Sequence, residues 1–218
     1  MIAETLVETF PALGAIPGVI HGFTGRAAGL DVKLDRALAL ERLDRAHAAA
    51  RAELGLAERR FVFAEQVHGA SVVIVDAQTS TPVAAADGLV TADRAVCLGI
   101  YVADCGPVFL VDPRQQVIAL LHSGRKGTEL GIASTAVERM VREFGCQPRE
   151  IVAQLGPCIR PPRYEIDFAA AILEQVRAAG VEEVHDCRTC TATHLDRYYS
   201  YRAEQGKTGR MLALLALQ

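Results

Sequence analysis

Three polar side chains, His68, Cys105 and His122, interrupt apolar stretches in a pattern that points to metal chemistry. His68 lies in a glycine-containing turn, Cys105 follows an apolar run that ends at Val102, and His122 ends the run that begins at Val117. Two imidazoles and one thiolate bind zinc or copper, and three protein ligands leave one position open, as in catalytic zinc sites. The spacings are long and irregular, so two loop histidines and a buried cysteine explain the same residues equally well.

Asp104 and Gln66 stand beside these residues in the chain and are the candidates for catalysis. A carboxylate at a strand end beside a metal can assist proton transfer or orient a nucleophile. It can equally serve as the hydrogen-bond partner of a ligand histidine. The Gln66 amide can hydrogen-bond a substrate or a ligand, or it can simply occupy a turn.

A basic segment after His122 predicts an anion site. Residues 123–128, Ser-Gly-Arg-Lys-Gly-Thr, place two cations between glycines where a helix is expected to begin. Free backbone N–H groups and the helix dipole favour an anion there, and Arg125 and Lys126 would strengthen a phosphate site. A solvated basic turn is the competing interpretation. Arg26 is a third candidate for phosphate contact, provided that it folds close.

The elements that position these residues are predicted from apolar periodicity and glycine stops. Helices are expected over Arg36–Leu54, Thr128–Phe144 and Phe168–Ala179. Strands are expected over Phe61–Ala64, Ser71–Asp76, Ala95–Val102, Val108–Val111, Val117–Leu121, Ile151–Leu155 and Met211–Leu217, the first two around the turn that holds His68. Because several strands follow one another directly, the pattern predicts an α/β fold with mixed rather than purely parallel sheets.

Composition excludes several classes of protein. The 218 residues are 50% hydrophobic and 22% charged with a net charge of −3, which suits one globular domain over residues 1–218. That charge argues against a general nucleic-acid or anionic-membrane binder, and no uncharged stretch free of proline and glycine is long enough for a transmembrane helix. The first ten residues carry two glutamates and no basic run, so no secretory leader is expected. We therefore expect a cytoplasmic protein with reduced thiols.

The remaining cysteines and histidines give no second motif. Cys187 and Cys190 form a C-x-x-C pair, but the residues after it do not begin a helix as a thioredoxin-type motif requires. His47 lies in an alanine-rich helix and is interpreted as a surface or packing residue. His21, His185 and His194 have no supporting partners in the sequence.

A series of short motifs runs in order between Phe61 and Arg210. They are Gln66-Val67-His68-Gly69, Ala86-Asp87-Gly88-Leu89-Val90-Thr91, Ala103-Asp104-Cys105-Gly106-Pro107, His122-Ser123-Gly124-Arg125-Lys126-Gly127-Thr128, Leu155-Gly156-Pro157-Cys158-Ile159 with Tyr164-Glu165, Cys190-Thr191, Tyr199-Ser200-Tyr201-Arg202 and Lys207-Thr208-Gly209-Arg210. This series resembles the laccase-domain (YfiH-like) family, once described as polyphenol oxidases.

The resemblance implies a single-domain, four-layer α/β/β/α sandwich whose metal ligands fall on His68, Cys105 and His122. It implies a zinc-dependent purine nucleoside enzyme that phosphorolyses adenosine, inosine, guanosine and methylthioadenosine and deaminates adenosine. A bacterial branch of the family is linked to editing of peptidoglycan precursors. The expected partners are a purine nucleoside and phosphate, with no nucleic acid and no membrane. Multicopper laccase chemistry is not supported, because those enzymes need paired His-x-His motifs that this chain lacks; a single copper ion still suits the three ligands.

The chain departs from the family where His-Ala-Gly-Trp-Arg-Gly is usual. Here Arg125 replaces the tryptophan and Lys126 replaces the arginine, so positive charge survives without the stacking ring or the bidentate fork. The Asn-Leu segment and Asn-Arg pair common in the family's N-terminal third are also missing. Two alternatives stay open: a metal-free hydrolase or deamidase with Cys105 as nucleophile and a histidine base, and a partner-binding protein without activity.

Overall fold

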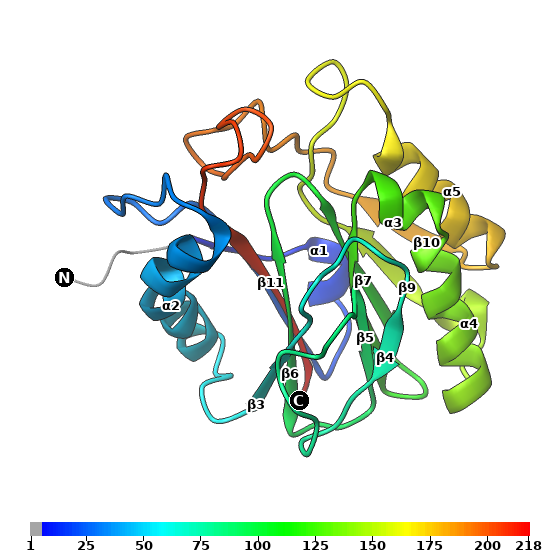
Figure 1. The fold of residues 1–218 in the computed structure, drawn as a ribbon. Coiled ribbons are helices and arrows are strands. Elements are labelled where there is room, and N and C mark those ends of the chain that lie inside the picture. Colours follow the sequence, from blue (N-terminus) through cyan, green and yellow to red (C-terminus); the bar gives the residue numbers. More distant parts are fainter. Residues whose placement is uncertain (1–5) are drawn as a thin grey trace.

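The computed structural model describes residues 6–218, which form two β-sheets and a set of covering helices (Figure 1). One sheet has five strands in the order β1-β2-β11-β6-β3: Val7–Glu8, Val19–Thr24, Met211–Leu217, Val96–Val102 and Arg60–Phe63. The other has six in the order β10-β9-β7-β8-β5-β4: Glu183–Asp186, Val152–Leu155, Gly106–Asp112, Val117–Ser123, Gly88–Thr91 and Val72–Ile74. Each sheet contains both parallel and antiparallel pairs, as expected.

The sheets pack face to face and helices cover their outer faces (Figure 1). The outer helices are α2 Arg36–Glu53, α3 Arg125–Glu129, α4 Ile132–Phe144 and α5 Phe168–Ala178, with a 3₁₀ turn at Pro148–Glu150. The short helix α1, Pro11–Gly14, instead contacts β2 of one sheet and β9 of the other. Along β11, Ala213 and Leu215 join the core between the sheets, whereas Leu212 and Leu214 pack on the opposite face, beneath the end of α2. Because both faces of the central strands are covered, these strands are apolar throughout. The four-layer α/β/β/α sandwich is confirmed.

The helix expected over Thr128–Phe144 is two helices, so the prediction of one continuous helix was wrong. Gly131 adopts φ 76°, a left-handed conformation that ends the short α3 and starts α4. The other two helices were predicted within one residue of their observed bounds. Asp35 caps α2 by accepting a hydrogen bond from the Leu38 N–H, and Gly55 at φ 72° follows the end of that helix.

The turn that carries His68 links the two sheets. The strands expected around it are present as β3 and β4, but β3 pairs with β6 in one sheet and β4 pairs with β5 in the other. This connection carries the chain across the sandwich at its edge, which local sequence did not predict. Strands β1, β2, β5 and β10 were also not expected.

Residues 1–5, the first half of the segment in which no secretory leader is expected, lie outside the described residues. Across residues 6–218, no helix has the length and apolar character needed to cross a bilayer.

Candidate metal centre and substrate pocket

His68, Cys105 and His122 come together although the chain separates them widely. Their ligand atoms all lie within 4.8 Å of one another, and the two imidazole rings meet edge to face with centroids 4.8 Å apart. His68 lies in the turn between the sheets, Cys105 lies where β6 of one sheet passes into β7 of the other, and His122 lies in β8. The long spacings therefore reflect three chain segments that meet at one end of the sandwich.

Asp87, at the start of β5, orients this set from behind. Its fully buried carboxylate accepts hydrogen bonds from the backbone N–H groups of Val67, His68 and Gly69 at 3.2, 2.9 and 2.7 Å. It also lies 2.8 Å from Nδ1 of His122, which leaves Nε2 of that ring to face the other ligands. A carboxylate that fixes a ligand histidine in this way sets its tautomer and raises its basicity.

The charges of the site favour a deprotonated thiol. Burial alone would raise the pKa of Cys105, but the charge and hydrogen bonds of His122, together with His68, lower it to about 6. Burial alone would lower the pKa of His122, but the Cys105 thiolate and Asp87 raise it to about 9. A thiolate is the form of cysteine that binds metal, so the group is poised for coordination.

The space around Cys105 is kept open by Gly124. A Cβ at this position would lie 2.5 Å from the Cys105 sulfur, so any side chain there would displace the thiolate. Together with two imidazoles, this sulfur forms a donor set that suits zinc or a single copper ion. His68 is exposed, which leaves one side of the set open to solvent or substrate. The residues therefore fit a metal ion with an open coordination position.

Gln66 fixes the turn that carries His68. Its side-chain amide donates to the carbonyl of Tyr101 at 2.6 Å and accepts from the N–H of the same residue at 3.0 Å. Gln66, His68 and Asp104 all have positive φ, at 66°, 61° and 83°, a conformation uncommon for non-glycine residues. Three of the seven non-glycine residues with positive φ among residues 6–218 are therefore one of the candidate ligands or a close neighbour of one in the chain.

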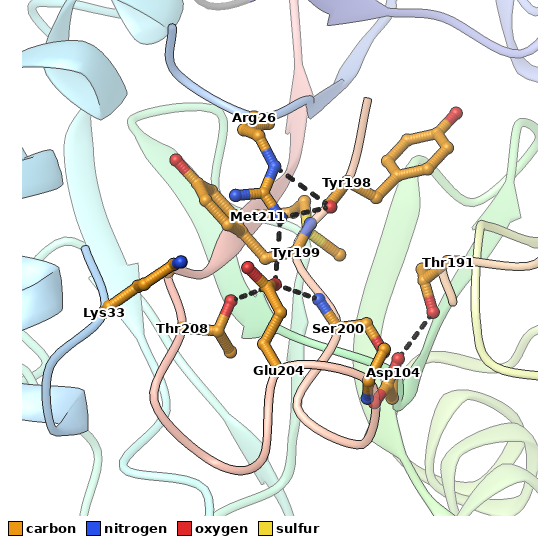
Figure 2. Close-up of polar contacts among 12 residues, drawn as sticks. Arg26, Lys33, Asp104, Thr191, Tyr198, Tyr199, Ser200, Glu204, Thr208 and Met211 are labelled. Carbon is orange, nitrogen blue, oxygen red and sulfur yellow. Dashed lines mark hydrogen bonds and ion pairs between the residues drawn. The ribbon is translucent and has the colours of Figure 1, made fainter. Parts of the chain in front are cut away.

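Asp104 is nearly buried beside Cys105, and both of its carboxylate oxygens are engaged. One accepts from the Thr191 hydroxyl at 2.7 Å (Figure 2). The other accepts from the Arg202 N–H at 2.7 Å. Its hydrogen-bond partners are thus not the ligand histidines. Asp104 joins the metal ligands to residues 198–210, an irregular segment that we term the C-terminal loop.

A pocket of about 1170 Å³ lies in front of the metal ligands. Its aromatic lining residues are Tyr101, Tyr164, Phe168 and Tyr201. Its basic lining residues are Arg36, Arg125, Lys126, Arg202 and Arg210. Gln66 and Asp104 line it as well, so the structure brings both catalytic candidates to the same space as the three ligands. The volume is enough for a drug-sized ligand with room to spare.

The three residues predicted to contact phosphate lie in two different places. Arg125 and Lys126 line the pocket from α3, where both are exposed and Arg125 pairs with Glu129 at 2.8 Å. Arg26 is not among the lining residues. Its guanidinium donates to the Tyr198 carbonyl and to the Glu204 carboxylate, both at 2.9 Å (Figure 2). These bonds tie it to the back of the C-terminal loop.

Two further residues behave as packing groups. His47 is buried against Tyr101, with Nε2 3.1 Å from the Arg210 carbonyl, which confirms the packing interpretation. Cys190 lies opposite Cys158 in a short β-bridge outside the pocket lining, and both thiols are free.

The chain matches the profile of a family described as multi-copper polyphenol oxidoreductase laccase, over residues 21–171 and 163–218. It is 34% identical to a purine nucleoside phosphorylase of Streptomyces coelicolor, over 72% of this chain and 75% of that protein. It is also 34% identical to a purine nucleoside phosphorylase of Deinococcus radiodurans, over 91% of this chain and 89% of that protein. Among solved structures it resembles YlmD from Geobacillus stearothermophilus, with a TM-score of 0.83, 25% identity and coverage of 99% and 96% of the two chains.

Proposed function

The chain belongs to the laccase-like family that it matches, and on that premise we propose that it is a metal-dependent purine nucleoside phosphorylase. The observation that carries the proposal is the convergence of His68, Cys105 and His122 on one wall of a pocket that also holds several cations. Both features suit phosphorolysis, because cations attract and neutralise the phosphate anion and a Lewis acid can orient a reactant beside the ribose C1′. The names of the two bacterial relatives point to the same reaction.

The bond changes of the reaction define what the residues must do. A phosphate oxygen forms a bond to the ribose C1′ while the bond from C1′ to the purine nitrogen breaks, and the purine takes up a proton. A bound zinc ion would supply Lewis-acid polarisation at the site. Asp104, held in one direction by Thr191 and the Arg202 N–H, assists proton transfer or orients the nucleophile. Gln66 keeps the His68 turn in place through Tyr101.

The rest of the pocket provides recognition. Tyr164 and Tyr201 offer aromatic surface on which a flat purine can stack, and Arg125 and Lys126 contribute positive charge from α3. We include adenosine, inosine, guanosine and methylthioadenosine as substrates. Adenosine deamination at the same centre is part of the proposal, with Asp104 as the carboxylate that moves protons.

Metal analysis followed by product analysis tests this function. We expect zinc in the native protein and phosphate-dependent release of base from adenosine and inosine, with ammonia from adenosine. Removal of the metal with a chelator should abolish both activities, and added zinc should restore them. If metal-loaded protein releases neither base nor ammonia, the nucleoside function is wrong.

A second candidate is a metal-free hydrolase or deamidase, favoured by the lowered pKa of Cys105 and its contact with two histidines. In that case Cys105 is the nucleophile and His68 or His122 its base. The two candidates differ in their inhibitors. Chelation stops the metal enzyme, whereas thiol alkylation with no effect of chelator identifies the cysteine enzyme.

A further inference from the structure

Arg210 is a nearly buried arginine whose charge has no acidic partner. Only 9% of the residue is exposed, and Nη1 donates to the carbonyls of Thr208 and Gly209 at 2.8 and 2.9 Å. Among residues 6–218, no carboxylate lies within ion-pair distance of its guanidinium, and Nε and Nη2 donate to no protein atom. Neither nitrogen is a buried atom without a partner, so both reach the open space of the pocket that Arg210 lines. A nearly buried cation with a free donor edge in a pocket is placed to receive an anion.

Arg36 lines the same pocket, and its positive charge makes the charged form of Arg210 less favourable. It is the first residue of α2, its Nη2 donates to the Glu65 carbonyl at 3.0 Å, and it too forms no ion pair within the described part of the chain. Burial and the nearby charge of Arg36 lower the pKa of Arg210, whereas Cys105 and Asp104 raise it. Arg210 therefore lies near enough to the metal ligands and to Arg36 to feel the charges of both.

The other two arginines of the pocket differ in this respect. Arg125 pairs with Glu129 at 2.8 Å, and Arg202 pairs with Glu165 at 3.0 Å. Both are exposed, so water screens them as well. Of the four lining arginines, only Arg36 and Arg210 form no ion pair with any residue between 6 and 218. Arg36 is exposed, whereas Arg210 is nearly buried and its guanidinium lies over the Tyr201 ring, 5.9 Å from the ring centroid.

The position of Arg210 is fixed in advance by the C-terminal loop. The Glu204 carboxylate accepts from the Ser200 N–H at 3.0 Å, from the Thr208 hydroxyl and from Arg26 (Figure 2). His47, on α2, holds the Arg210 carbonyl. A guanidinium held in place before binding loses little freedom when an anion arrives.

We propose that Arg210 and Arg36 form a phosphate subsite on the wall of the pocket near the metal ligands. The free edge of the Arg210 guanidinium matches two oxygens of a phosphate, and Arg36 adds a second cation. This rests on the proposed function in one respect: within that function, the bound group is the phosphate that attacks the nucleoside. The same chemistry would hold the 5′-phosphate of a nucleotide.

Calorimetric titration of the metal-loaded protein at constant ionic strength tests the subsite directly. The probes are inorganic phosphate, adenosine 5′-monophosphate and adenosine. We expect Arg210→Met to weaken phosphate binding roughly 10- to 100-fold, as for loss of charge-assisted hydrogen bonds, and Arg36→Met to weaken it several-fold. Adenosine binding should stay within about twofold of wild type. Arg177→Met, which removes an exposed arginine of α5 outside the pocket, is the control of equal charge.

Arg36→Met also guards against misfolding, because it leaves the buried bonds of Arg210 intact. The probes separate the source of the phosphate: inorganic phosphate alone indicates the co-substrate, whereas Arg210-dependent binding of the nucleotide alone indicates a nucleotide ligand. Either result supports the subsite. Unchanged binding of both probes in Arg210→Met and Arg36→Met overturns it.

Steady-state kinetics distinguishes a failure of the phosphate subsite from a failure of the proposed phosphorylase function. If wild type releases base, the Arg210 and Arg36 variants should raise the KM for phosphate and leave the KM for the nucleoside unchanged. Base release with an unchanged phosphate KM overturns the subsite and keeps the function. Arg210-dependent phosphate binding without any base release overturns the proposed function and keeps the subsite.

Discussion

The two sides of the pocket are built differently. The metal side depends on sheet structure: His122 lies in β8, which pairs with β5 and β7, and Cys105 directly precedes β7. The other side, the C-terminal loop, has no strand or helix and is held by side-chain bonds to Glu204, Asp104 and His47. One side is thus fixed by many backbone hydrogen bonds and the other by a few polar side chains. Metal binding and substrate binding should therefore respond to different substitutions.

The largest expected effect is on the metal side. Cys105→Ser replaces a thiolate with a hydroxyl that is a poor ligand, so metal content should fall and base release should drop at least about 10³-fold. Elemental analysis and a base-release assay check both quantities. Cys187→Ser, at a free cysteine outside the pocket, should change neither. Retained phosphate binding in Cys105→Ser would show that the two sides work separately, and its loss would contradict the comparison.

The second effect is the pH dependence of stability on the loop side. Burial lowers the pKa of His47 to about 4, although the Arg210 carbonyl and Asp44 oppose the shift. The unfolded chain therefore binds this proton more readily, so stability should decrease as the pH falls from about 6.5 to about 4, by about 3 kcal/mol in total. Above about pH 6.5, His47 is neutral in both the folded and the unfolded chain and does not contribute to the pH dependence of stability.

Urea unfolding at several pH values measures this effect as the difference between wild type and His47→Gln. The glutamine can still donate to the Arg210 carbonyl but does not titrate, so its curve should be flatter between pH 6.5 and 4. His194→Gln, at an exposed histidine, should follow wild type. Parallel curves for His47→Gln and wild type would mean that His47 is not held neutral.

The third effect concerns the orientation of His122. Asp87→Asn removes the charge that fixes Nδ1 of this ligand, so metal affinity should fall about 10- to 100-fold while the bound stoichiometry stays at one. Competition with a chelator of known affinity measures it. Asp93→Asn is the matched control, because Asp93 also accepts backbone N–H bonds, from Ala77 and Ala95, but lies outside the pocket. Equal affinities for the two variants would contradict the role of Asp87.

The smallest effect is expected for the polar centre of the loop. Glu204→Gln weakens the bonds from Arg26, Ser200 and Thr208 and should cost about 1 kcal/mol of unfolding free energy. Amide exchange should increase within residues 198–210, and metal content should not change. Glu150→Gln, which removes a carboxylate paired with Arg114, is the control. A loss of metal in Glu204→Gln would show that the sides are not independent.

The grouping of His68, Cys105 and His122 as candidate metal ligands could be predicted, because each has a distinctive donor and stands at a strand end beside glycine. Asp87 could not be predicted in its role. Its four bonds depend on the approach of the His68 turn to β5, which only the tertiary fold produces, although an acid before a glycine at a strand start was a visible signal. The assignment of β3 and β4 to separate sheets has the same origin, since local alternation does not say which sheet a strand joins.

Charge alone does not identify which basic residues are available to bind a ligand. Arg26, Arg125 and Lys126 were selected for type and sequence position, whereas Arg210 was present only within a motif. Arg26 and Arg125 differ from Arg210 by their acidic partners, Glu204 and Glu129, and Glu204 lies 178 residues from Arg26 along the chain. Lys126 differs from Arg210 by its exposure. Burial and pairing decide which cation is available to a ligand, and neither can be predicted from local sequence.

Because the chain breaks at Gly131, α3 is a short separate helix between β8, which carries His122, and α4. Before α3, His122 is held by the pairing of β8 and by Asp87. After α3, α4 packs on the same six-stranded sheet. Residues 125 and 126, which are both exposed, can therefore be substituted while His122 stays in place. A library of variants at these two positions is therefore a practical route to altered substrate preference in a folded scaffold.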